Sequence, residues 1–144
     1  GEYERAAELI DKAIGMHKKE KNHGGLAAAY NNKGYLLQLQ GDPGALELYL
    51  SALEQDRYIE NSLGISSDLH NIAGYHKETG DYDRALFYYK RALEVNRRLE
   101  LVQRIGSDLQ NIIDMLRILG REEDAKMYKK ALDELAEPGV SGID

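Results

Sequence analysis

Two eight-residue strings decide the fold, ISSDLHNI at residues 65–72 and IGSDLQNI at residues 105–112. They stand 40 residues apart and differ at two positions. A weaker copy, LAAAYNNK at residues 26–33, precedes the first string by 39 residues. Similarity at a fixed spacing of this size indicates an architecture built from stacked structural repeats. We call each string, together with the residues that follow it, an A segment.

A second kind of segment, called B, follows each A segment. It begins GDYDRAL at residues 80–86, GDPGAL at residues 41–46 and GREEDA at residues 120–125, and a further copy, GEYERAA, opens the chain at residues 1–7. The order along the chain is therefore B, A-B, A-B, A-B, with a period near 40 residues.

Both segments have the periodicity of helices. In the B segment, small and apolar residues recur at three- and four-residue steps, which places them on one stripe of a helix. These residues are Ala85, Tyr88, Tyr89, Ala92, Val95 and Leu99. In the A segment, Leu69, Ile72, Ala73 and His76 follow the same rule, which makes His76 a core histidine.

Glycine, asparagine and aspartate mark the expected helix ends. Gly41, Gly80 and Gly120 each follow an A segment, where a left-handed residue ends a helix at little cost. Asp42, with Pro43 at the first helical position, and Asp81 are expected to cap the following B helices. Asn and Gly at 22–25 and 61–64 predict loops, whereas the link at 98–104 lacks them and is expected to be partly helical.

One pair of such helices cannot bury both of its faces, but stacked pairs can. Small residues in register let the B helices approach the A helices closely; they are Ala6, Ala13, Gly34, Ala45, Ala52, Ala73, Ala85 and Ala92. We therefore predict an all-α fold, an α-solenoid of stacked antiparallel helix pairs with about seven helices. Its parts are an isolated B helix at 1–22, repeats at 25–61, 64–101 and 104–137, and a flexible tail at 138–144.

The repeated residues resemble the tetratricopeptide repeat family. Its small–small–Ala–aromatic–Ala pattern matches Ala73, Gly80, Ala85, Tyr89 and Ala92, and the resemblance covers about residues 1–136. The period resembles the longer subtype of kinesin light chains, LGN/Pins-type adaptors and bacterial peptide-sensing regulators. The resemblance implies a right-handed superhelix whose A helices line a concave groove that binds a peptide or a helix of a partner protein.

Mapping that groove onto this chain gives the candidate binding residues. They are Asn31, Asn32, Tyr35, His70, Asn71, Lys77, Gln110, Asn111, Asp114 and Arg117, with Ala28, Gln38, Ser67, Gly74 and Ser107 beside them. The family's carboxylate clamp uses Lys and Asn at positions that here hold other residues, so that clamp is not expected.

Amide side chains in the candidate groove carry both hydrogen-bond donors and an acceptor, so they could read the backbone of an extended ligand. Asn32, Asn71 and Asn111 recur at one position, which favours a structural tie from one repeat to the backbone of the next over ligand contact. Asn31, His70 and Gln110 vary, and we expect ligand contact there. Lys77 and Arg117 favour an acidic ligand or are ordinary solvated charges, the second being preferred.

Tyrosines at helical spacing are mostly core residues in this interpretation. Tyr35 is the exception, and we expect it to face the groove.

Composition excludes several other classes of function. The 144-residue chain has a net charge of −6, which argues against a nucleic-acid-binding domain. It has no cysteine, which excludes disulfides and thiolate metal sites, and no apolar run that would span a membrane. The N-terminal residues lack the basic and then apolar pattern of a secretory signal, and we expect a cytoplasmic protein.

No motif for catalysis is present either. The chain has no Gly-rich phosphate loop, nucleophile elbow or His-Glu-x-x-His motif. His70 and His76 stand six residues apart, on different faces of a helix, which makes a poor metal pair. We therefore expect a non-enzyme without cofactor or metal.

Three functions remain open. The leading hypothesis is a scaffold that binds a protein or peptide in its groove. The first alternative is a ligand-sensing regulatory domain of a larger protein. The second is self-association through the N-terminal helix, whose Leu9, Ile10, Ala13 and Ile14 are expected to contact the following A helix while its other flank stays exposed.

Overall fold

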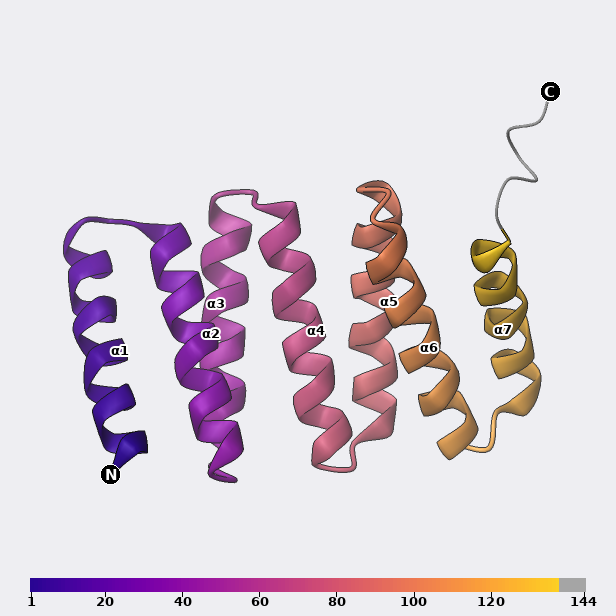
Figure 1. Cartoon of the computed structure of the whole chain (residues 1–144), viewed down its shortest axis with the longest axis horizontal. Helices are drawn as coiled ribbons and strands as arrows, with labels where there is room; N and C mark the ends of the chain where they lie inside the picture. Colours follow the sequence, from indigo (N-terminus) through magenta and orange to yellow (C-terminus); the bar gives the residue numbers. More distant parts are fainter. Residues whose placement is uncertain (138–144) are drawn as a thin grey trace.

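The computed structural model describes residues 1–137 and contains seven α-helices there. The helices are α1 (Glu2–Lys19), α2 (His23–Leu39), α3 (Ala45–Tyr58), α4 (Ser62–Glu78), α5 (Tyr82–Arg98), α6 (Val102–Ile118) and α7 (Glu122–Ala136). They form one row in chain order, with α1 at one end and α7 at the other (Figure 1). No strand occurs in this part of the chain, so the predicted all-α solenoid is confirmed. The predicted tail at 138–144 lies outside the described residues.

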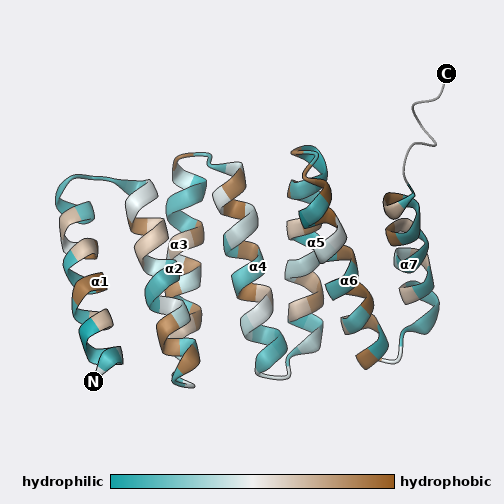
Figure 2. Cartoon of the chain, in the orientation of Figure 1, coloured by the Kyte–Doolittle hydropathy of each residue, from teal (hydrophilic) through white to brown (hydrophobic). Residues whose placement is uncertain are grey.

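The core is a series of clusters along the row and has no single centre. Ile14, Leu26 and Ala29 form the first cluster, between α1 and α2. A second one joins α3, α4 and α5, and a third joins α4, α5, α6 and α7. Apolar and polar residues alternate around each helix, as stacked helices with solvent on their outer faces require (Figure 2).

Small residues allow the close packing between A and B helices, as predicted. Ala45, Ala52, Ala85 and Ala92 are completely buried. Gly34 of α2 lies so near α3 that an added Cβ would come within 2.8 Å of the Tyr49 ring. Any larger residue at that position would push the two helices apart.

Each helix from α1 to α6 is terminated by a residue with a positive φ, which lies two positions after the last helical residue. Gly41, Gly80 and Gly120, with φ values of 70°, 82° and 74°, end the A helices, as the sequence predicts. The B helices end in Lys21, Glu60 and Glu100, with φ values of 55°, 54° and 56°, which the sequence did not indicate. The backbone bonds are the same in both groups; for example, Asn61 N–H donates to the Asp56 carbonyl at 2.9 Å.

Because these helix ends are so tight, two of the expected loops are shorter than predicted. Residues 23–25 and 62–64 are helical. Asn22 and Asn61 are N-caps, and their side chains accept hydrogen bonds from the N–H groups of Gly25 and Gly64. The Asn-x-x-Gly pattern thus starts the A helices and does not form loops.

The start of α3 also differs from the prediction. Asp42 does accept a hydrogen bond from Gly44 N–H at 2.8 Å, but the helix begins at Ala45 and not at Pro43. The prediction for Asp81 is confirmed, because its side chain accepts from Arg84 N–H at the start of α5.

The N-terminal helix packs on one edge only. Ile10 and Ile14 pack with the apolar residues of α2, as predicted. The prediction for Leu9 is wrong, because its side chain is 68% exposed and does not belong to the apolar cluster between α1 and α2. No helix within residues 1–137 is both long and apolar enough to cross a membrane.

Two glycines of the same repeat are expected to respond to alanine in opposite directions. Gly80→Ala should lower the free energy of unfolding by about 1 kcal/mol, because alanine is strained at its φ of 82°. Gly74→Ala should raise it by roughly 0.5–1 kcal/mol, because Gly74 lies inside α4 and an added Cβ would meet nothing within 4 Å. Urea unfolding measures the free energy of unfolding of both variants. A lower value for Gly74→Ala than for the wild type would contradict the open space around Gly74.

Candidate functional site

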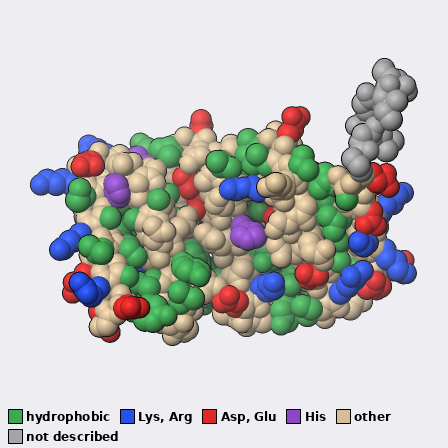
Figure 3. Space-filling model, viewed as in Figure 1, with side chains coloured by type: hydrophobic (Ala, Val, Ile, Leu, Met, Phe, Trp, Pro, Cys, Tyr) green, Lys and Arg blue, Asp and Glu red, His purple; other side chains and the backbone are tan. Residues whose placement is uncertain are grey.

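The candidate groove residues form one stripe on each of the three A helices. In α2, α4 and α6 they occupy exposed or half-buried positions at three- and four-residue steps, so each set faces the same side of its helix. Charged side chains are most frequent at the two ends of the row, and separate acidic and basic side chains also lie along the middle of the face in Figure 3.

Side-chain hydrogen bonds join the stripe of α2 to that of α4. The Asn31 amide donates to Asp68 Oδ1 at 2.6 Å, and the Gln38 amide donates to Glu78 Oε2 at 2.7 Å. Gln38 also accepts a hydrogen bond from the hydroxyl of the buried Tyr49 at 2.6 Å. The first two A helices are therefore held in register by polar contacts at their shared edge.

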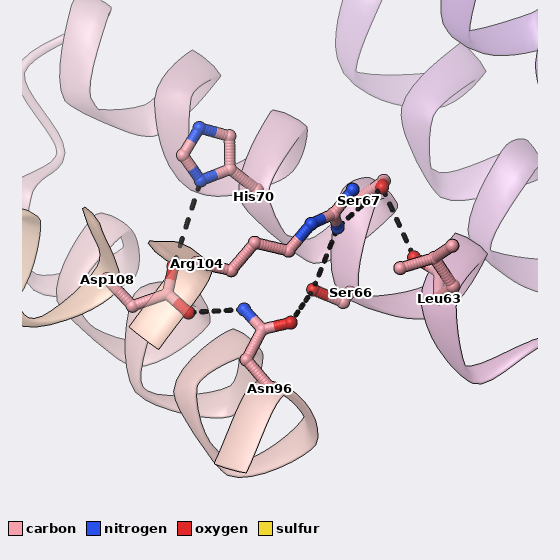
Figure 4. A network of polar contacts seen from close by, with 7 residues as sticks. All are labelled: Leu63, Ser66, Ser67, His70, Asn96, Arg104 and Asp108. Atoms are coloured by element: carbon pink, nitrogen blue, oxygen red, sulfur yellow. Dashed lines mark hydrogen bonds and ion pairs between the residues drawn. The ribbon is translucent and has the colours of Figure 1, made fainter. Parts of the chain in front are cut away.

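A polar network joins α4 to α6 and includes a residue from α5 (Figure 4). The Ser66 hydroxyl donates to Asn96 Oδ1 at 2.6 Å, and the Asn96 amide donates to Asp108 Oδ2 at 2.5 Å. Arg104 donates to Ser67 Oγ at 3.1 Å. Ser66, Asn96 and Asp108 are buried. Beside the network lies a pocket of about 290 Å³ that opens on the groove face.

The prediction that Asn32, Asn71 and Asn111 tie one repeat to the backbone of the next is wrong. The side chains of Asn32, Asn71 and Asn111 form no hydrogen bond with any of residues 1–137, so they do not tie one repeat to the next. Asn31 makes a tie of that kind, although we expected ligand contact there. The reason is its place at the edge of α2, where it faces the buried Asp68.

The remaining candidates lie at the surface. Tyr35 is 61% exposed, and that it faces the groove stays a prediction. Tyr49 and Tyr89 are buried, in line with the core role expected for most tyrosines. Burial raises the pKa of both buried phenols to about 12. The Gln110 amide donates to Asp114 at 2.9 Å.

Lys77 and Arg117 are also at the surface. Both are exposed, and Arg117 lies 3.6 Å from Glu122. This pairing agrees with the preferred interpretation of solvated charges.

His76 is buried in α4, as predicted, and its ring stacks on Tyr88 at 5.7 Å. Burial lowers the pKa of His76. No group of three or more His, Asp or Glu side chains within residues 1–137 is arranged to hold a metal ion.

Comparison with protein families identifies the fold. The family model for the tetratricopeptide repeat matches residues 25–98, about half of the chain. The chain belongs to the tetratricopeptide repeat family. No curated protein matches the sequence.

A solved structure has a similar fold. The crystal structure of BtubC (BKLC) from P. vanneervenii superposes with a TM-score of 0.83 at 17% sequence identity. The match covers 100% of this chain and 63% of that one. At this identity the likeness supports the fold alone.

Two of the repeats share a buried polar position but fill it differently. Asp56 of α3 and Asp68 of α4 form a hydrogen bond, and both are buried. The residues 40 positions later, Asn96 of α5 and Asp108 of α6, are also buried and hydrogen-bonded to each other. In the second pair, the amide supplies the hydrogen that the carboxylate needs. Two carboxylates cannot do this for each other unless one of them is protonated.

The pair of carboxyl groups therefore holds a proton. Burial, followed by the hydrogen bond with Asp56, raises the pKa of Asp68 to about 8. Asp68 Oδ2 and Asn31 Oδ1 are buried acceptors without a donor among the described residues. A proton on Asp68 supplies the missing donor.

Sequence reasoning missed these buried positions and also Arg104. The signal was present, because Asp68 and Asp108 are identical within the two deciding strings, and Asp56 and Asn96 are spaced in the same way. Spacing alone does not distinguish these aspartates from solvated carboxylates, because it does not show that a polar position of a helix is buried.

Replacing Asp56 with the residue of the next repeat is expected to stabilise the fold at high pH. The folded chain keeps the Asp68 proton up to about pH 8, whereas an unfolded aspartate loses it near its ordinary pKa of 3.8. Stability is thus lost progressively as the pH rises from about 4 to 8. Asp56→Asn supplies an amide donor, lowers the pKa of Asp68 and should raise the free energy of unfolding by roughly 1–3 kcal/mol at pH 8, with little gain at pH 4.

Urea unfolding between pH 4 and pH 9 checks this. Glu54→Gln, at an exposed position of the same helix, is the control and should leave the pH profile unchanged. Parallel profiles for the wild type and Asp56→Asn would show that the two carboxyl groups do not share a proton.

Proposed function

We propose that the groove face of α2, α4 and α6 binds an extended or helical segment of a partner protein. The main support is the row formed by Asn32, Asn71 and Asn111. These amides lie on neighbouring helices and make no hydrogen bond with the described part of the chain. Each offers donors and an acceptor, so together they suit the regularly spaced polar groups of a peptide backbone.

The dimensions and chemistry of the face agree with this proposal. Each A helix has 17 residues, a length of about 25 Å. A ligand that crosses the three helices would meet Tyr35 near one end and Gln110 near the other. Members of this family generally act as scaffolds for protein–protein interaction and not as enzymes, which favours binding without catalysis.

A second candidate function is self-association through α1. Leu9 and Met16, which are seven residues apart and so lie on one flank of α1, are 68% and 60% exposed. Apolar side chains of this size on one helix flank favour contact with another apolar surface. A second copy of the chain is the simplest such surface.

Groove binding is tested with peptides selected from a random library on the immobilised chain. Tyr35→Ala and Gln110→Ala should each weaken the selected peptides about 5- to 30-fold, because each removes a contact worth about 1–2 kcal/mol. Phe87→Ala, which removes an exposed ring from α5, is the matched control and should leave affinity unchanged. Equal loss in all three variants, or no loss in either groove variant, would contradict binding at this face.

Self-association is tested by light scattering over a range of protein concentrations. The wild type is expected to show a rising average mass, and Leu9→Glu with Met16→Glu should restore the monomer mass, because charged residues oppose burial of this flank. A wild type that stays monomeric at high concentration would remove this second candidate.

A further inference from the structure

A second cavity, of about 300 Å³, lies among α3, α4 and α5 and is separate from the candidate groove. On α4 it is lined by Ser62, Ile65 and Leu69, which share one side of the helix. None of them is a candidate groove residue. Val95 of α5 adds to the apolar part of the lining. The cavity is therefore a feature distinct from the surface proposed above to bind a peptide.

The preceding repeat fills the equivalent place with its own side chains. There the rings of His23 and Tyr58 pack with their centres 4.3 Å apart, and His23 Nδ1 lies 2.7 Å from Gln55 Oε1. The matching positions of the next repeat, 39 or 40 residues later, hold Ser62, Val95 and Arg98. A small hydroxyl stands where an imidazole would be, and a guanidinium stands where a phenol would be. The cavity is thus the space that a pair of rings occupies one repeat earlier.

Three arginines line this cavity. Arg57 belongs to the last turn of α3, and Arg91 and Arg98 stand two turns apart on one face of α5. None of the three lies within 4.0 Å of a carboxylate of residues 1–137. Glu94 is the single acidic residue of the lining. Three arginines and one glutamate leave an excess of two positive charges here, in a chain whose net charge is −6.

Local pairing does not explain these arginines. Glu94 stands three residues after Arg91 and four before Arg98, at the spacings that favour ion pairs on a helix, yet it pairs with neither. Arg91 lies 5.6 Å from the centre of the Phe87 ring, a cation–π contact that leaves its N–H groups without hydrogen-bond acceptors. The Ser62 hydroxyl makes no hydrogen bond with the described part of the chain either. The cavity thus combines an apolar lining with unused hydrogen-bond donors.

We propose that this cavity binds the phosphotyrosine side chain of a segment of a partner protein. The ring occupies the apolar part, where the preceding repeat has its own pair of rings, and the phosphate meets the three guanidinium groups and the Ser62 hydroxyl. A phosphate monoester carries a charge of about −1.5 to −2 at pH 7, which matches the excess of positive charge in the lining. Guanidinium groups offer paired N–H donors that suit phosphate oxygens. The proposal is independent of peptide binding in the groove.

Simpler ligands fit the cavity less well. A carboxylate carries one negative charge and leaves part of the positive excess unbalanced. Inorganic phosphate leaves the apolar lining in contact with water. A free aromatic phosphate leaves Leu99 of the lining and the adjacent Leu63, which are 38% and 49% exposed, in water as well. A protein segment with residues on either side of the phosphotyrosine covers both leucines.

The chemistry is tested first with phenyl phosphate. Titration of the isotope-labelled chain at constant ionic strength should move the amide NMR signals of Ser62 and Val95 saturably in the millimolar range. Inorganic phosphate lacks the ring and benzoate has a single charge, so each should bind at least about 5-fold more weakly. Equal binding of either compound, or shifts that sodium chloride reproduces, would overturn the proposal.

Two arginine variants locate the site. Arg91→Gln and Arg98→Gln should each weaken phenyl phosphate binding about 5- to 30-fold, because each removes a charged hydrogen bond at a partly solvated position. Arg97→Gln makes the same charge change at an exposed position of α5 outside the cavity, and this matched control should retain the affinity. Equal weakening in all three variants, or none in the first two, would contradict a defined site.

Filling the cavity provides a separate test. Ser62→His combined with Arg98→Tyr rebuilds the ring pair of the preceding repeat in this place. The double variant should lose phenyl phosphate binding, while its unfolding temperature stays at or above that of the wild type. Binding that persists in the folded double variant would show that the ligand lies elsewhere.

The source of the aromatic phosphate is then tested with a blocked tripeptide, acetyl-alanyl-phosphotyrosyl-alanine amide. It should bind at least as tightly as phenyl phosphate, and its phosphoserine counterpart should bind at least about 5-fold more weakly. A phosphotyrosine peptide that binds more weakly than phenyl phosphate would exclude a protein segment and contradict the proposal. Tyr35→Ala, on the groove face, should change neither affinity, so this test and the test of groove binding fail independently.

Discussion

The fold depends on the close approach of helices through alanine and glycine at fixed positions. Each helix pair has two apolar edges, so it stays stable only with a neighbour on each side. Ala45, Ala52, Ala85 and Ala92, all fully buried, allow this contact to repeat along the row. A row built this way has no central core, and the outer faces of its A helices remain free. The proposed binding surface therefore follows from the way the helices pack and needs no additional helix or loop.

The contacts between repeats are partly polar, which connects packing with the groove. Asn31 with Asp68, and Asn96 with Asp108, lie where adjacent A helices meet. Next to the second pair, Arg104 and His70 contact the same network and line the groove pocket.

The sequence was sufficient for the architecture and insufficient for the polar details. The repeated strings and the glycines at 41, 80 and 120 predicted seven helices and three of their ends, because periodicity and left-handed glycine act locally. Lys21, Glu60 and Glu100 adopt the same conformation without glycine, since the tertiary stack requires a tight link there. Asn31 and Asn32 are adjacent in sequence, yet one bonds to Asp68 and the other faces solvent. The two side chains point in different directions around α2, and residue spacing alone does not show which of them meets Asp68.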